Sequence, residues 1–177
     1  MAKIEIAKER VFEDTYRHKG LRKKLVETLR EKGISDENVL EAINKIPRHF
    51  FLDTALDEIA YEDRSFSIDA DQTISHPYTV AFQSQLLEVK PNQIVLEIGT
   101  GSMYQGAILA AMGAKVITIE RQKKLYDKTK FFPLVKEYPQ TSIRFFWGDG
   151  FEGLPNYSPF DKIIITCGAP FIPPKLI

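Results

Sequence analysis

Between residues 94 and 168, short apolar runs alternate with segments of helical pattern. The runs are rich in β-branched or aromatic residues, as strands are, and they span 94–99, 115–120, 143–149 and 160–168. The first two gaps, 103–113 and 121–139, have helical patterns, although Pro133 is expected to kink or split the second helix. Strands that alternate with helices form a parallel sheet with right-handed crossovers. We therefore predict an α/β fold with a doubly wound, mainly parallel sheet.

The sequence before residue 90 is mostly helical in pattern. Leucines recur every fourth residue from 21 to 29, and Gly33 follows them, which predicts an amphipathic helix that ends at this glycine. Ser35 is expected to cap a second helix, which ends at Pro47. Three further elements follow: a short helical segment from Asp53, a loop or irregular hairpin over 63–77, and a helix over 77–87. We therefore expect a helical extension ahead of the α/β core.

Charge and cysteine content exclude several classes of partner. Lys and Arg together number 24, as do Asp and Glu, so the zero net charge favours neither nucleic acid nor an anionic membrane. One cysteine cannot form an internal disulfide, and the three histidines are scattered at 18, 49 and 76 without Cys or Glu at metal-ligand spacing. No signal peptide and no membrane-spanning run is present. We expect a monomeric cytoplasmic protein without a metal.

The first strand-like run ends in a turn of sequence GTGS. In a doubly wound sheet this turn holds a phosphate or nucleoside, and glycines there permit positive φ and a close approach of the backbone to a ligand. Glu120 ends the second run about 20 residues later, where a carboxylate accepts hydrogen bonds from both hydroxyls of a ribose. We therefore expect a nucleoside site that includes Gly99, Thr100, Gly101, Ser102 and Glu120.

The residues around this turn indicate which nucleoside it holds. Tyr104 stands where a dinucleotide fingerprint has its third glycine, so NAD is disfavoured. Glu97 precedes the turn in the order ExGxG, and Asp149 and Gly150 end the third run, where a carboxylate can bind an adenine amino group. This arrangement suits S-adenosylmethionine. The alternative is that ExGxG forms only a tight turn, as in any α/β protein.

Seven stretches resemble the protein-L-isoaspartate O-methyltransferase family, in the family's order. They are PRHFF (47–51), AYEDRSFSI (60–68), QTISHPYTVA (72–81), VLEIGTGSMYQGAILA (95–110), VITIER (116–121), GDG (148–150) and FDKIIITCGAPFIPPKLI (160–177). The resemblance implies an S-adenosylmethionine-dependent protein carboxyl O-methyltransferase of Rossmann-like fold. Its expected reaction methylates the free α-carboxylate of L-isoaspartyl residues, and by extension D-aspartyl residues, in damaged proteins and peptides, which initiates their repair.

The resemblance also implies roles for individual residues. Ser75 resembles the family's active-site serine, whose hydroxyl donates a hydrogen bond to the substrate carboxylate and is not a nucleophile. Because a carboxylate is already ionised near neutral pH, the reaction requires no general base. The alternative for Ser75 is to cap the helix that begins at residue 77. The substrate site is expected to include Thr73, Ile74, His76, Thr166 and Pro173.

The chain departs from the family pattern in two places. Met103 stands where the family usually has glycine, and its side chain either interferes with the cofactor or turns away at the start of the helix. The chain ends at Ile177 where the family continues, so the core over 91–177 is expected to lack its C-terminal strands. The helical extension and active-site loop over 1–90 are expected to pack on this core as one domain. The alternatives are a weakly active or inactive relative that binds a peptide or partner, and a methyltransferase for another carboxylate.

Overall fold

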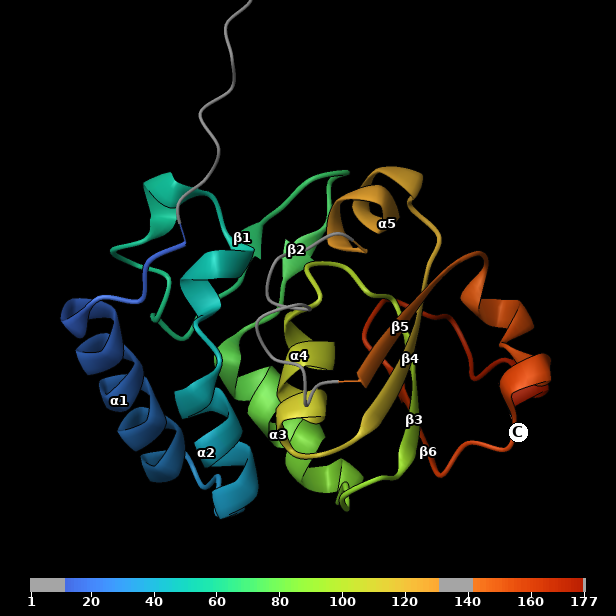
Figure 1. Ribbon diagram of the computed structural model, residues 1–177, viewed down its shortest axis with the longest axis horizontal. Coiled ribbons are helices and arrows are strands. Elements are labelled where there is room, and N and C mark those ends of the chain that lie inside the picture. The colour runs from blue at the N-terminus through green and yellow to red at the C-terminus, as the bar shows by residue number, and fades with distance from the viewer. Residues whose placement is uncertain (1–11, 131–141, 177) are drawn as a thin grey trace, which may run out of the picture.

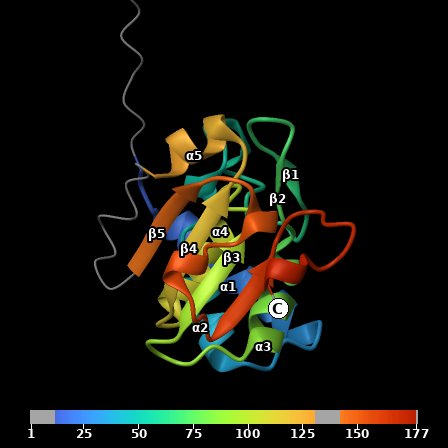
Figure 2. The ribbon, with the colours of Figure 1, turned by 90° about the vertical axis from the view of Figure 1, so that its right-hand side faces the viewer.

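The computed structural model describes residues 12–130 and 142–176. Its main sheet has four parallel strands in the order β5-β4-β3-β6. They are β3 (Ile94–Ile98), β4 (Lys115–Glu120), β5 (Ser142–Trp147) and β6 (Lys162–Ile165). Their carboxyl ends lie at the same end of the sheet, near α5 (Lys123–Thr129) (Figure 2). The chain moves outward from β3 to β5 and then returns to the other side of β3 with β6, which confirms the predicted doubly wound sheet.

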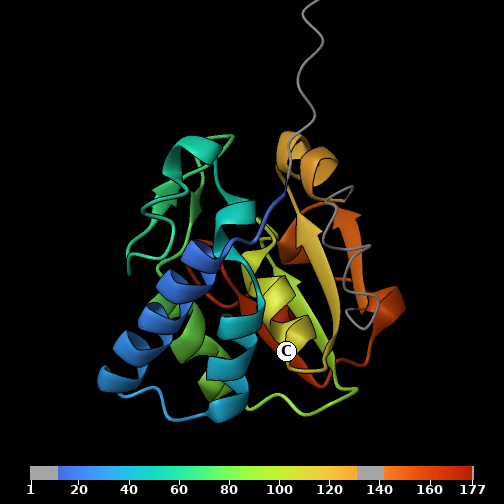
Figure 3. The same cartoon turned by 60° about the vertical axis from the view of Figure 1, so that its left-hand side comes forward.

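The larger hydrophobic core lies between one face of the sheet and a group of helices (Figures 1 and 3). α4 (Tyr104–Ala111) contacts β4 and β5, and its residues from Tyr104 to Ala110 are all buried. On this side α2 (Glu37–Lys45) and α3 (Pro77–Leu87) contact α4, and α1 (Tyr16–Glu31) packs against α2 and α3. The N-terminal helices and α4 therefore lie on the same face of the sheet.

The opposite face of the sheet has a smaller core. Leu96 and Ile98 of β3 point to this face and lie beside Ile117 and Ile119 of β4 in the parallel register. Apolar residues from the segments around three short 3-10 helices pack on it. These helices are η3 (Gly150–Glu152), η4 (Pro155–Tyr157) and η5 (Pro174–Leu176), and the packed residues are Leu154, Phe160 and Leu176. Both faces of β3 and β4 are thus buried, as their continuous apolar runs predict.

In the N-terminal part, the structure adds the start of the first helix to the prediction and differs from it in two details. α1 begins at Tyr16, before the leucine repeat, because Thr15 and His18 form a reciprocal capping box. α2 is capped by Asp36 and not by Ser35, since the Asp36 carboxylate accepts hydrogen bonds from the second and third amides of the helix. The segment from Asp53 forms only a 3-10 turn, η2 (Thr54–Leu56), followed by further turns.

The polar segment over 63–77 forms an irregular hairpin, as predicted. Its strands, β1 (Phe66–Ser67) and β2 (Thr73–Ile74), pair antiparallel. α3 then begins at Pro77. Of the helix predicted over 121–139, α5 is present, and Pro133 lies outside the described residues. Among the described residues, no helix is both long and apolar enough to cross a membrane.

Candidate active site

A cavity of about 300 Å³ lies at the carboxyl ends of β3, β4 and β6. A doubly wound sheet binds its ligands at this end, where the strand order reverses. The β2 end of the hairpin forms the other wall. All but one of the predicted site residues line the cavity: Thr73, Ile74, Ser75, Glu97, Gly99, Thr100, Gly101, Ser102, Glu120, Asp149, Gly150, Thr166 and Pro173.

The GTGS turn has a backbone that requires its glycines. Gly99 and Gly101 have φ values of +98° and +53°. A Cβ atom at Gly99 would lie 3.1 Å from Thr166 Oγ1 and 3.1 Å from Cys167 Cβ, so the end of β6 leaves little room there. The Thr166 hydroxyl donates to the Gly99 carbonyl oxygen at 2.6 Å. Thr166 therefore joins the turn to β6 as well as lining the cavity.

Glu120 is fixed by two backbone amides at the edge of the turn. Its Oε2 accepts from the Gly101 amide at 2.9 Å, and its Oε1 accepts from the Gln122 amide at 2.7 Å. The side chain is 6% exposed and lines the cavity. Because each carboxylate oxygen has more than one lone pair, both oxygens can still accept a hydrogen bond from a ligand. This geometry suits a pair of vicinal hydroxyls.

Glu97 presents an unpartnered carboxyl group to the cavity. It is fully buried, and neither carboxylate oxygen makes a hydrogen bond with any described residue. Burial raises the pKa of Glu97 to about 8, and the charge of Glu120 adds to this increase. The Thr118 hydroxyl and the Gly106 amide oppose it, although neither makes a hydrogen bond of normal geometry. A buried acceptor without a partner fits a cationic ligand group.

Gly106 of α4 explains how the carboxyl group of Glu97 fits beneath the helix. A Cβ atom on Gly106 would lie 2.9 Å from Glu97 Oε2. A larger residue would therefore push the helix away from β3 or displace the carboxyl group.

Asp149 and Gly150 form the far rim of the cavity. Asp149 is exposed, and its Oδ1 accepts from the Phe151 amide at 3.0 Å, which caps η3. A Cβ atom on Gly150 would lie only 2.2 Å from Ile98 Cγ2, so this position is restricted by packing against β3. Asp149 can still accept hydrogen bonds from a ligand in the cavity. Gly150 permits the close packing against Ile98 that positions Asp149.

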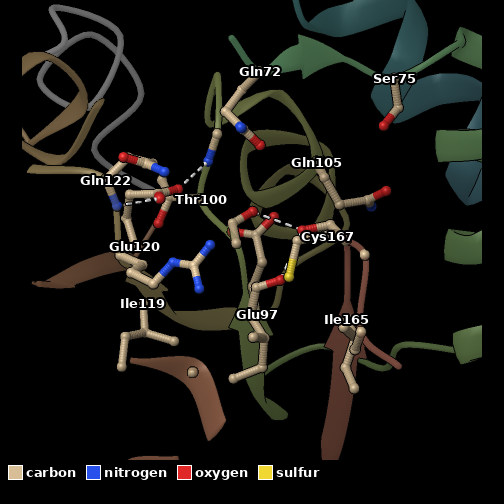
Figure 4. A pocket seen from close by; sticks show the side chains of 18 of the residues that line it. Gln72, Ser75, Glu97, Thr100, Gln105, Ile119, Glu120, Gln122, Ile165 and Cys167 are labelled. Atoms are coloured by element: carbon tan, nitrogen blue, oxygen red, sulfur yellow. Dashed lines mark hydrogen bonds between the residues drawn. The ribbon is translucent and has the colours of Figure 1, made fainter. Parts of the chain in front are cut away.

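Ser75 follows β2 and is half-buried in the cavity wall. Its hydroxyl makes no hydrogen bond with a described residue, and α3 is preceded by His76 with no side-chain cap. The capping alternative for Ser75 is therefore wrong. Ser75 and Glu120 lie on opposite sides of the cavity, with Glu97 and Gln105 between them (Figure 4). His76, which was predicted to bind substrate, is exposed and does not line the cavity.

Met103 occupies the position that raised doubt about the turn. It precedes α4 with φ of +73°, a left-handed conformation that favours glycine. Its side chain is 1% exposed in the larger core and does not line the cavity. Of the two alternatives for this side chain, the second is therefore confirmed: it turns away from the cavity at the start of the helix.

Gln105 is a cavity residue that the sequence analysis missed. Its Nε2 donates to the Ser84 hydroxyl at 2.8 Å, whereas its buried Oε1 has no hydrogen-bond partner among the described residues. Its position on the first turn of α4, directly after the GTGS turn, is a signal that indicates contact with the strand ends. Arg121, Gln122 and Cys167 also line the cavity.

Two of the histidines, which are far apart in the sequence, lie side by side in the structure. The His18 and His49 rings stack with centroids 3.8 Å apart, and Asp14 lies beside them. Arg22 donates to both Asp14 oxygens at 2.9 Å, and His49 is hydrogen-bonded with the Tyr61 hydroxyl at 2.7 Å. The cluster is therefore part of a hydrogen-bonded network in the helical part of the protein.

The sequence profile of the protein-L-isoaspartate(D-aspartate) O-methyltransferase family matches residues 20–177. Proteins named protein-L-isoaspartate O-methyltransferase from Christiangramia forsetii and Flavobacterium johnsoniae are each 56% identical to this chain. In both cases the similarity covers 94% of this chain and 77% of the relative.

Solved structures agree with these sequence similarities. A structure named protein-L-isoaspartate O-methyltransferase is 28% identical, with a TM-score of 0.77 over 87% of this chain and 50% of its own. A putative protein-L-isoaspartate O-methyltransferase from Plasmodium falciparum, solved with S-adenosyl-L-homocysteine, is 23% identical and shares the fold with a TM-score of 0.72 over 88% of this chain and 77% of its own. Together, the profile and the two bacterial relatives show that this chain belongs to the protein-L-isoaspartate(D-aspartate) O-methyltransferase family.

Proposed function

We propose that the chain transfers the methyl group of S-adenosylmethionine to the free α-carboxylate of L-isoaspartyl residues in damaged proteins, which initiates their repair. One observation carries the proposal: in a single cavity, the buried carboxyl group of Glu120 lies on one side, that of Glu97 lies toward the centre, and the Ser75 hydroxyl, which has no hydrogen-bond partner among the described residues, lies on the opposite side. The first side suits a charged nucleoside, and the second suits an anionic substrate. Family membership supports the same activity.

The residues of the cavity fit the functional groups of this cofactor. Glu120 would accept hydrogen bonds from the ribose hydroxyls, and the Glu97 oxygens, which have no partner among the described residues, would accept from the ammonium group. Asp149 at the rim binds the adenine amino group, while the backbone from Gly99 to Ser102 passes along the ribose and methionine parts. When bound, the cofactor supplies a methyl group on a sulfonium, which leaves as a neutral thioether.

On the substrate side, the role of the protein is to orient the substrate carboxylate, which is already ionised and reactive. The Ser75 hydroxyl donates a hydrogen bond to one carboxylate oxygen and leaves the other directed toward the methyl group. Thr73 and Ile74 contribute the adjoining wall, with Thr166 and Pro173 opposite. Orientation of this kind accounts for roughly 7–11 kcal/mol of a barrier when the reacting atoms are well aligned. No step requires a general base or a metal.

Methyl transfer to matched peptides tests the proposal. The protein is incubated with methyl-labelled S-adenosylmethionine and either an isoaspartyl peptide or the same peptide with a normal aspartyl residue. A base-labile methyl ester should form on the isoaspartyl peptide alone. Equal labelling of both peptides contradicts the substrate assignment, and labelling of neither supports a binding protein without turnover. A peptide with D-aspartate tests the proposed extension of the substrate range.

We also infer that the protein acts as a cytoplasmic monomer and not on nucleic acid. The balanced charge of 24 basic and 24 acidic residues and the single cysteine support this inference. Light scattering during gel filtration, and a binding assay with duplex DNA at low salt, test the monomer and the absence of nucleic-acid binding.

A further inference from the structure

Arg48 is a charged side chain in the interior of the protein. It lies in η1 (Arg48–Phe51), directly after α2, and is 0% exposed. Arginine is rarely buried to this degree unless it is paired, because removal of a charge from water is costly. No salt bridge joins Arg48 to a carboxylate among the described residues. Its partners are therefore of another kind.

The guanidinium group of Arg48 is bonded to backbone carbonyl groups from two separate segments. Its Nε donates to the Ala60 carbonyl oxygen at 3.0 Å, and its Nη2 donates to the Arg64 carbonyl oxygen at 3.3 Å. Nη2 also donates to the Ser75 carbonyl oxygen at 2.8 Å. The guanidinium carbon lies 4.8 Å from the centre of the Tyr104 ring, at the start of α4. One planar group thus joins the 60–64 segment, the end of β2 and α4.

The shortest of these bonds reaches the residue whose hydroxyl lines the substrate side of the cavity. The hairpin that carries Ser75 has only two residues in each strand, and such a hairpin has little stability of its own. Within the part of the chain that the structure describes, the Ser75 side chain has no hydrogen bond that would fix it. The position of its hydroxyl therefore depends on the backbone, and Arg48, which does not line the cavity, donates a hydrogen bond to that backbone.

Stability alone is a poor explanation for a charge at this position. Hydrophobic residues of similar volume often replace buried charges without loss of stability. Arg48 does not line the cavity, so it contacts neither proposed ligand. What an apolar residue cannot do is donate two or three directed hydrogen bonds within one plane.

We propose that Arg48 is a positioning residue, which holds the Ser75 carbonyl oxygen and thereby fixes the Ser75 hydroxyl against the substrate carboxylate. This inference rests on the proposed methyl transfer to isoaspartyl residues. The inference assigns a role to a residue outside the cavity. Orientation of the substrate carboxylate depends on this residue, whereas binding of the cofactor does not.

Arg48→Lys is the first variant, because lysine keeps the charge but cannot donate to three carbonyl groups from one planar fork. We expect kcat for the isoaspartyl peptide to fall by up to about tenfold, because displacement of the Ser75 hydroxyl cannot cost more than the loss of its one hydrogen bond to a charged group. The dissociation constant for S-adenosylmethionine, measured by calorimetry, should not change. Arg48→Met is the second variant and should give the same separation of the two readouts.

Arg22→Lys is the matched control. Among the described residues, Arg22 is the other buried arginine, with 5% exposure, and its bonds go to Asp14, Asn44 and Tyr61, away from the hairpin. This variant should lose stability as Arg48→Lys does, but its kcat should stay at the level of the unmodified chain.

The outcomes separate this inference from the proposed function. An unmodified chain that does not methylate the isoaspartyl peptide refutes the proposed function, and the role of Arg48 with it. If the unmodified chain is active, an unchanged kcat in Arg48→Lys, or an equal loss in Arg22→Lys, overturns only the positioning role. In a Ser75→Ala background, Arg48→Lys should cause little further loss, whereas additive losses would also overturn it.

Discussion

Replacement of Met103 separates two opposing contributions to stability. The residue has a left-handed backbone, with φ of +73°, and a side chain that is only 1% exposed. Glycine would relieve the backbone strain but would remove the buried side chain. Alanine would remove the side chain and keep the strain. Both variants therefore lose the buried side chain, and only Met103→Gly also loses the backbone strain.

The size of each contribution predicts the order of stability. Truncation of a buried methionine to alanine costs roughly 2–5 kcal/mol in free energy of unfolding. A left-handed residue other than glycine carries about 1–2 kcal/mol of strain, and glycine itself costs roughly 0.5–1 kcal/mol in backbone entropy. Met103→Gly should therefore be less stable than the unmodified chain by about 0.5–5 kcal/mol, yet more stable than Met103→Ala by up to about 1.5 kcal/mol.

Urea denaturation of the three proteins at one pH measures these differences. Within a helix alanine is normally the more stabilising residue by about 1 kcal/mol, so the expected order is the reverse of the usual one. If Met103→Ala is the more stable variant, the left-handed backbone is contradicted. If Met103→Gly is more stable than the unmodified chain, the buried packing of the side chain is contradicted. Affinity for S-adenosylmethionine should change in neither variant, because Met103 does not line the cavity.

Three further substitutions test the site. Gly150→Ala should destabilise the chain by about 1–3 kcal/mol, because the new Cβ would lie 2.2 Å from Ile98 Cγ2. In the control, Gly168→Ala, the new Cβ has no neighbour within 4 Å and stability should not change. Equal melting temperatures of the two variants would contradict the packing of Gly150 against Ile98. Burial raises the pKa of Glu97 from 4.5 to about 8, so between these pH values the folded chain binds a proton that the unfolded chain does not. The contribution of this proton to the free energy of unfolding is complete below pH 4.5 and is lost as the pH rises through 8. Glu97→Gln stays neutral and should flatten this decline in urea titrations at several pH values; an unchanged slope would rule out Glu97 as its source. Ser75→Ala should lower kcat for the isoaspartyl peptide roughly tenfold, the value of one lost hydrogen bond to a charged group, and full activity would exclude the proposed role.

The main features of the fold, and the residues that line the cavity at the strand ends, could be predicted from sequence because they follow from local patterns. Gly99, Gly101 and Glu120 lie at strand ends, and the ends of parallel strands meet at one edge of the sheet. Knowledge of the strands is therefore sufficient to bring these residues together. Thr73 to Ser75 could be placed only through the family resemblance, since nothing in their local pattern directs the hairpin toward the sheet.

The remaining features depend on contacts between distant segments. A charged Arg48 is normally expected on the surface, and only its carbonyl partners explain its burial. The stacking of His18 on His49 joins α1 to η1 and leaves no trace in residue spacing. His76 is adjacent to Ser75, yet it lies outside the cavity, because the chain turns into α3 at that point. The division at residue 90 stays a prediction.

The central claim is that one cavity holds the cofactor beside β3 and β4 and the substrate carboxylate beside the hairpin. Calorimetric titration of S-adenosylmethionine into the unmodified chain, Glu120→Gln and Ser75→Ala tests this arrangement most directly. A hydrogen bond to a charged acceptor contributes about 1.5–3 kcal/mol. Its loss in Glu120→Gln should therefore raise the dissociation constant for S-adenosylmethionine roughly 10- to 100-fold. Ser75→Ala should bind like the unmodified chain. No binding to the unmodified chain, or equal weakening in both variants, would contradict the account.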